Sequence, residues 1–241
     1  MPPEYAPDRS KKIAVPIAII IAGVLIAGAM YVNGSRKASR TNEAPAVPAS
    51  GEPAFRPIGV DDHMLGNPRA AVVILEYSDT ECEFCKDFHQ TMTQILDQYG
   101  PNGQVAWVYR HFPVHEKSRK EAEATECAAE IGGNAGFWKY IDAIFAATPS
   151  NDGLDEKLLP EIAKDTGIDR RLFEACLSSG RHADQVQDDY DDAIRAGAQG
   201  TPHNIIIAGN NVLPFPGAQS YASLKSAIDL ILDQVSPPIQ N

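Results

Sequence analysis

Two short apolar runs enclose one amphipathic segment in the first half of the chain. Residues 71–77 (AVVILEY) and 104–110 (QVAWVYR) are rich in β-branched and aromatic side chains, which is typical of buried strands. Between them, apolar residues recur at spacings of three and four over residues 84–99, and Gly100-Pro101 ends this helical pattern. The order of strand, helix and strand predicts an α/β fold.

Helical patterns dominate the second half of the chain. Apolar spacing predicts helices near residues 121–131, 137–145, 158–164, 170–177 and 183–196. The block of about residues 115–180 holds more helix than a simple crossover between strands needs, so we expect a helical insertion there. Residues 204–207 and 212–213 then flank a Gly-Asn-Asn turn and predict a hairpin, and residues 221–235 predict a last amphipathic helix.

An uncharged apolar stretch occupies residues 13–32. It is long enough to cross a hydrocarbon layer of ~30 Å as a helix, so it predicts a transmembrane helix or signal anchor that follows a cytoplasmic N-terminus, residues 1–12. Ala27-Gly28-Ala29 resembles a signal-peptidase site, so a cleaved signal peptide is the alternative. Residues 33–57, rich in Ala, Pro and Ser, predict a flexible linker, and residues 58–241 are expected to form one domain.

Composition excludes some classes of partner. The chain of 241 residues is 44% hydrophobic, which is enough for a full core, and its net charge of −11 argues against a nucleic-acid partner. The acidic residues are expected to keep the surface solvated. Among them, the cluster Asp188, Asp189, Asp191 and Asp192 is expected on a helix face, and no chemistry is assigned to it.

The motif Cys82-Glu83-Phe84-Cys85 lies where the first predicted strand gives way to the helix. Unpaired N–H groups at a helix start lower the pKa of a thiol, and cysteines three residues apart can close and reopen a small disulfide ring. The motif therefore predicts a redox-active dithiol. A chance pair, a structural disulfide and half of a metal site are the alternatives, although the chain has no second closely spaced Cys or His pair that a zinc site would want.

Three acidic residues lie close to this dithiol in the sequence. Asp79, Glu81 and Glu83 would disfavour a thiolate at Cys82 by like-charge repulsion. We therefore expect the pKa of Cys82 to lie below that of a free cysteine but well above the ~3.5 of the strongest dithiol oxidants.

Several short motifs together resemble the DsbA-like thiol-disulfide oxidoreductases. The resemblance covers about residues 59–234 and implies a thioredoxin-like fold, a central mixed sheet flanked by helices, with an inserted helical subdomain. Glu83, where the family commonly has Pro, and His203, where Thr or Ser is common, depart from the family pattern. The matching marks are Asp62-His63-Met64-Leu65-Gly66, Leu75-Glu76-Tyr77-Ser78-Asp79, the dithiol with Lys86, Glu126-Cys127-Ala128-Ala129, Phe137-Trp138, residues 173–177 with a Cys, and Gly200-Thr201-Pro202.

The resemblance also implies roles for residues outside the dithiol. Thr201-Pro202 is implied to be a cis peptide beside Cys82, with the Thr201 backbone free to pair with an extended substrate. Glu76 matches a buried acidic position that accepts the proton of Cys85. An ordinary loop proline and a surface glutamate on an edge strand are the alternatives.

Two cysteines remain outside the motif, Cys127 and Cys176. A thiol-disulfide site together with two further cysteines suits an oxidising compartment, where spare thiols usually pair, so we expect a structural disulfide between them. Two separately buried free cysteines are the alternative. The same argument places the catalytic domain on the extracytoplasmic side of a bacterial cytoplasmic membrane, held by a single span, or secreted into the periplasm after signal cleavage.

The expected function is that of an extracytoplasmic disulfide oxidase, in which Cys82 is the exposed nucleophile. Electrons move between sulfurs, so no metal or organic cofactor is expected beyond the redox-active disulfide. The expected partners are cysteine-containing exported proteins and a membrane redox protein that recycles the dithiol. A reductase or isomerase of the same fold is one alternative, and a copper or zinc carrier that uses Cys82, Cys85 and His203 is another.

Overall fold

The computed structural model describes residues 55–235. The predicted transmembrane segment, residues 13–32, lies outside the described residues, as do the N-terminal twelve residues and most of the predicted linker. Within residues 55–235, no helix is both long and apolar enough to span a membrane.

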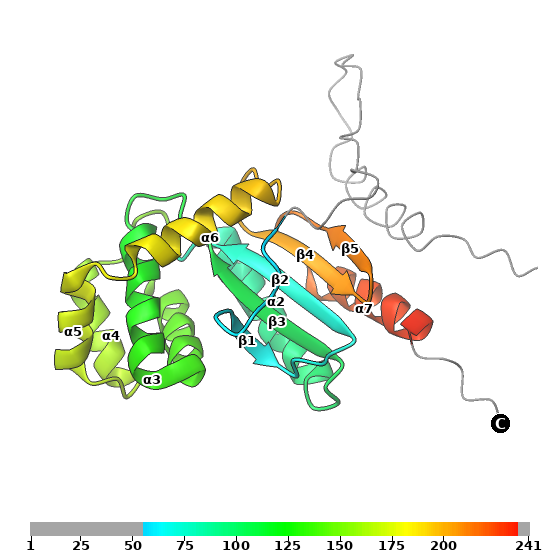
Figure 1. The fold of residues 1–241 in the computed structure, drawn as a ribbon, viewed down its shortest axis with the longest axis horizontal. Coiled ribbons are helices and arrows are strands. Elements are labelled where there is room, and N and C mark those ends of the chain that lie inside the picture. The colour runs from blue at the N-terminus through cyan, green and yellow to red at the C-terminus, as the bar shows by residue number, and fades with distance from the viewer. Residues whose placement is uncertain (1–54, 236–241) are drawn as a thin grey trace, which may run out of the picture. The chain divides into compact units, whose positions relative to one another are not determined.

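A mixed five-stranded sheet with the order β1-β3-β2-β4-β5 forms the centre of the domain (Figure 1). Strands β2 and β3 are parallel, and the three other neighbouring pairs are antiparallel. β2 is central and almost wholly buried, which explains its continuous apolar sequence. The strands are β1 (His63–Gly66), β2 (Val72–Ser78), β3 (Val105–His111), β4 (His203–Ala208) and β5 (Asn211–Pro214).

Helices cover both faces of the sheet. Helices α2 and α7 lie together behind the sheet in the view of Figure 1, and α6 crosses its front. On the α6 side, Ala193 packs against Leu75 and Val108 of the two parallel strands. The helices are α2 (Glu83–Tyr99), α3 (Ser118–Ala147), η1 (Glu156–Leu158), α4 (Leu159–Asp165), α5 (Arg170–Ser179), α6 (Ala183–Arg195) and α7 (Tyr221–Val235).

The helical block between β3 and α6 has a core of its own. Tyr140 and Ile144 of α3 pack there with Leu159 of α4 and Phe173 of α5. The two helices predicted near residues 121–131 and 137–145 form one element, α3, which is interrupted at Gly133, where φ is +63°. A disulfide between Cys127 and Cys176 joins α3 to α5 across this core.

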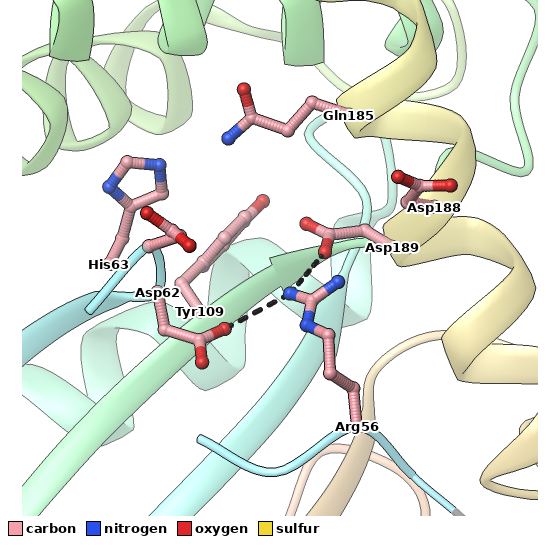
Figure 2. A pocket seen from close by; sticks show the side chains of 8 residues that line it. Arg56, Asp62, His63, Tyr109, Gln185, Asp188 and Asp189 are labelled. Carbon is pink, nitrogen blue, oxygen red and sulfur yellow. Dashed lines mark hydrogen bonds and ion pairs between the residues drawn. The ribbon is translucent and has the colours of Figure 1, made fainter. Parts of the chain in front are cut away.

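A buried arginine organises the contact between α6 and the sheet. The Arg110 side chain is fully buried and donates hydrogen bonds to Asp62 at 2.7 Å and to Asp192 at 2.6 Å. Arg56 pairs with Asp62 and Asp189, as Figure 2 shows. A buried charge is tolerated when it is paired in this way, so the network fixes α6 over β3.

The expectation that the acidic cluster of α6 is solvated was wrong for two of its members. Asp189 and Asp192 are buried because they face Arg56 and Arg110, whereas Asp188 and Asp191 are exposed. Arg56 and Asp189 also line the pocket drawn in Figure 2, together with Asp62, and this pocket has a volume of about 450 Å³. Since its buried carboxylates are satisfied within the protein, we assign the pocket no ligand.

We predict that the disulfide of the helical block contributes substantially to stability. Replacing Cys127 and Cys176 together by Ala should lower the free energy of unfolding by ~4 kcal/mol, the loop-entropy value for a sequence separation of 49 residues. Urea denaturation of the two proteins measures this difference, with strongly reduced wild-type protein as the matched control. An unchanged midpoint in both would contradict the prediction.

Candidate active site

The dithiol lies at the N-terminus of α2, directly after the turn that follows β2. Cys82 is the N-cap residue of α2, and its side chain makes no capping hydrogen bond. Both thiols are free in this structure, with Cys82 6% exposed and Cys85 completely buried. Cys82 is thus more buried than expected, because the loop of Thr201 lies beside it, with the Thr201 carbonyl oxygen 3.5 Å from its sulfur. It is nevertheless the cysteine that solvent reaches.

The two thiols differ in acidity. A hydrogen bond from the Cys85 thiol lowers the pKa of Cys82 to about 6, although partial burial raises it. The N–H groups of Phe84 and Cys85 also lower this pKa. Burial and the neighbouring Cys82 thiolate raise the pKa of Cys85 well above its ordinary value. Cys82 is therefore the thiolate at neutral pH, and Cys85 keeps its proton.

This pKa of Cys82 agrees with the expected intermediate acidity, but two of the three acidic neighbours do not have the expected role. Asp79 and Glu81 are buried, whereas Glu83 is exposed. The carboxylate of Asp79 accepts hydrogen bonds from the N–H groups of Glu81, Val114 and His115. Its charge is thus engaged in fixing the backbone around the dithiol.

His115 is a residue near the site that sequence patterns did not indicate. Its Nδ1 lies 3.1 Å from the carboxylate of Asp79. Burial lowers the pKa of His115, but the negative charges of Asp79 and Cys82 outweigh burial and raise this pKa above its ordinary value. A protonated imidazole there favours the Cys82 thiolate. In the sequence, His115 is distant from Cys82, and the pairing of β3 with β2 brings the two together.

Glu76 lies buried beneath the dithiol. Its side chain accepts a hydrogen bond from Trp107 Nε1 at 2.9 Å, and its other oxygen has no hydrogen-bond partner among the described residues. Burial raises the pKa of Glu76 to about 8. A carboxyl group with this pKa exchanges protons readily near neutral pH, which suits a proton carrier for Cys85.

The peptide bond between Thr201 and Pro202 is cis. The following residue, His203, is buried at the start of β4, pairs with Tyr77 of β2, and burial lowers its pKa. Within the described part of the chain, the one set of three close ligand atoms belongs to Cys127, Cys176 and His182, and those two sulfurs are already bonded to each other. The geometry therefore does not assemble the Cys82, Cys85 and His203 site that a metal carrier would need.

Comparison with known proteins gives the family. The family model for thioredoxin matches residues 59–230. The chain belongs to the thioredoxin family. Within this family the chain is DsbA-like: it is 30% identical to Pseudomonas aeruginosa DsbA2, and the match covers 73% of this chain and 97% of that one with a TM-score of 0.61.

Other DsbA-like structures are also similar to this chain. Bacillus subtilis BdbD in its oxidised form is 25% identical, with 71% of this chain and 93% of BdbD covered and a TM-score of 0.62. Wolbachia pipientis alpha-DsbA1, at 22% identity and a TM-score of 0.65 over 73% of this chain and 94% of that one, shares the fold.

A different set of relatives consists of longer proteins. The chain is 33% identical over 144 residues to the Na(+)/H(+) antiporter NhaA 3 of Salinispora tropica, which covers 58% of this chain and 21% of the antiporter. It is 28% identical to the NhaA of Herminiimonas arsenicoxydans over 80% of this chain and 29% of that protein. This DsbA-like chain thus spans between a fifth and a third of the length of these relatives, and their transport activity is not carried over.

We predict that Cys82 titrates near neutral pH. The ultraviolet absorbance of the thiolate in the reduced protein should rise with a midpoint of about 6, well below the ordinary 9.0, and Cys82→Ser should abolish this step. Glu83→Gln is the matched control: Glu83 is exposed and screened, so the midpoint should move by less than ~0.5. A midpoint near 9 would show that the local hydrogen bonds do not stabilise the thiolate.

Proposed function

We propose that this protein is a disulfide oxidase that transfers its Cys82–Cys85 disulfide to cysteine-containing exported proteins. The observation that carries the proposal is the position of Cys82 at the N-terminus of α2, where hydrogen bonds from the Cys85 thiol and from helix N–H groups lower its pKa to about 6 and stabilise the thiolate of the reduced protein. Stabilising the reduced form makes the disulfide a stronger oxidant, since the dithiol is then the favoured product.

The geometry supports a mechanism in two exchange steps. A substrate thiolate attacks the sulfur of Cys82 and breaks the Cys82–Cys85 bond, and Cys85 leaves as a thiolate that takes a proton from Glu76. A second substrate thiolate then attacks the substrate sulfur of the mixed disulfide and releases Cys82 as a stabilised thiolate. The substrate gains one disulfide and the protein gains two electrons, so the mechanism needs no metal or organic cofactor.

The surface around Cys82 suits a polypeptide substrate. Phe84, two residues after Cys82, is 57% exposed, and Val114, whose N–H binds Asp79 beside the dithiol, is 49% exposed. Exposed apolar side chains next to a reactive group favour contact with unfolded chains. The Thr201 carbonyl beside the Cys82 sulfur supports pairing with an extended substrate backbone, as in strand addition.

The proposed location follows from the sequence. The apolar segment of residues 13–32 would hold the domain on the extracytoplasmic side of the bacterial cytoplasmic membrane, or would direct its export and be removed. There, a membrane redox protein would reoxidise the dithiol after each turnover. The Cys127–Cys176 disulfide supports an oxidising compartment, where such bonds persist.

Trapping of intermediates tests the exchange chemistry. Cys85→Ser removes the thiol that would resolve a mixed disulfide with Cys82, so exported proteins should accumulate as covalent adducts on non-reducing gels. Cys82→Ser should form no adducts, and Cys127→Ala with Cys176→Ala should leave the adducts of the Cys85 variant in place. Absence of adducts in a folded Cys85 variant with a reactive Cys82 would refute the assigned roles.

The reduction potential tests the direction. Because Cys82 has a pKa between those of DsbA and thioredoxin, about 3.5 and about 7, we expect a potential between the corresponding −120 mV and −270 mV. Equilibration of the soluble domain with glutathione buffers measures it. A potential at or below about −270 mV would instead identify a reductase.

A further inference from the structure

The carboxylate of Glu81, the residue before Cys82, is enclosed by a loop of the helical insertion. This loop, residues 148–154, connects α3 to η1 and is called here the rim loop. It donates three hydrogen bonds to Glu81, from Thr148 Oγ1 at 2.9 Å, Gly153 N at 2.9 Å and Leu154 N at 3.1 Å. A fourth bond, from Asn151 N, reaches the backbone oxygen of Glu81 at 2.7 Å. The rim loop is therefore attached directly to the peptide that leads into Cys82.

The backbone of the rim loop is strained and depends on these contacts. Ser150, Asn151 and Asp152 have φ values of +69°, +57° and +61°, although none of them is glycine. Three consecutive left-handed residues are unfavourable for L-amino acids and persist only where their surroundings hold them. Here the turn directs two of its N–H groups at the carboxylate of Glu81, so loss of that contact would weaken the attachment of the loop.

A second buried carboxyl group, Glu121 of α3, faces the turn that carries Glu81, and an interaction with Glu81 is among the causes that raise its pKa. Its Oε2 accepts a hydrogen bond from Thr80 Oγ1 at 2.6 Å, and its Oε1 is buried without a partner among residues 55–235. A carboxylate only accepts hydrogen bonds, and Glu81 already accepts three, so a proton on Glu121 would satisfy both groups at once.

We propose that Glu121 donates one proton to a hydrogen bond with Glu81, and that this acid pair fastens the rim loop beside Cys82 as a wall of the substrate-binding surface. When Glu121 loses the proton to water or hydroxide, two carboxylates face each other in a buried site. Their repulsion pushes Glu81 out of the turn that encloses it, and the rim loop detaches.

The acidity of Glu121 places this change above neutral pH. Burial, together with Glu81 and Asp79, raises the pKa of Glu121 from its ordinary 4.5 to about 8. A group whose pKa is raised by folding stabilises the folded arrangement below its ordinary pKa, and this contribution is lost as the pH rises through the folded value. The attachment of the rim loop is thus complete at acidic pH and lost above about pH 8.

Other charged groups surround the acid pair, and the two lysines among them bind backbone oxygens of the rim loop. Lys86 of α2 binds the carbonyl oxygen of Thr148 at 2.6 Å, and Lys117, before α3, binds that of Leu154 at 2.9 Å. The remaining titratable groups that face the pair or its loop are Asp79 and His115 beside the turn, Asp152 in the rim loop and Tyr140 of α3. Since these groups are unchanged in a Glu121 variant, such a variant separates the pair from them.

Amide hydrogen exchange in the rim loop tests the acid pair directly. In the wild-type protein, the protection factors of Asn151, Gly153 and Leu154 should fall about tenfold between pH 7 and pH 9, the scale of one lost hydrogen bond plus repulsion. Glu121→Gln keeps a donor toward Glu81 but cannot ionise, so its protection should stay constant over this range. Glu123→Gln, on the same helix, is the matched control and should behave as the wild type does.

Two outcomes would overturn the proposal. The first is a parallel loss of protection in the wild-type and Glu121→Gln proteins, and the second is a wild-type loop that is equally protected at both pH values. If Glu121→Gln does not fold, Thr80→Val decides. It removes a hydrogen bond that favours ionised Glu121, so the midpoint should shift to higher pH, and an unshifted midpoint would refute the pair.

The test with a substrate depends on the proposed disulfide-exchange activity, whereas the amide hydrogen-exchange test does not depend on any activity. Glu76 and the thiol of a cysteine-containing peptide substrate both titrate between pH 7 and pH 9, and they do so equally with the wild-type and Glu121→Gln proteins. The readout is therefore the ratio of the wild-type KM to the Glu121→Gln KM, which should rise about tenfold between pH 7 and pH 9. An unchanged ratio beside a detached rim loop would refute the wall, and absence of any exchange activity would refute the proposed function alone.

Discussion

Two buried carboxylates hold together the part of the molecule that carries the dithiol. Asp79 and Glu81 belong to the turn between β2 and α2, and each accepts hydrogen bonds from N–H groups of a different insertion loop. A buried N–H group that loses its acceptor lowers the stability of the fold by ~1–3 kcal/mol, which is more than a typical surface ion pair contributes. The position of Cys82 thus depends on the insertion as much as on the sheet, although no covalent bond joins the two at this point.

Burial is the second constraint on the site, and it acts on each group in proportion to its depth. Cys85 and Glu76 are fully buried and hold their protons more tightly than usual, whereas Cys82, at the helix start, releases its proton early. Burial therefore keeps the proton on the resolving thiol and on the acid beneath it, whereas hydrogen bonds from Cys85 and from the helix N–H groups lower the pKa of Cys82 against the effect of its own burial.

Local patterns were sufficient to predict β2, α2 and β3, because each of these elements buries a continuous or periodic apolar face. Strand β1 was missed: it has only four residues, is half exposed, and exists because its backbone pairs with β3. The roles of Asp192 and Glu121 were also hidden, since their partners, Arg110 and Glu81, are distant in the sequence. Periodicity shows which face of a helix is polar, but not whether that face meets water or a buried charge.

Formation of the Cys127–Cys176 disulfide requires an oxidant during the maturation of the protein. Four cysteines can pair in three ways, and a chain with all four thiols reduced carries no oxidant with which to make this bond. The two electrons must pass to another molecule, either an older oxidised copy of the same protein or an unrelated oxidant.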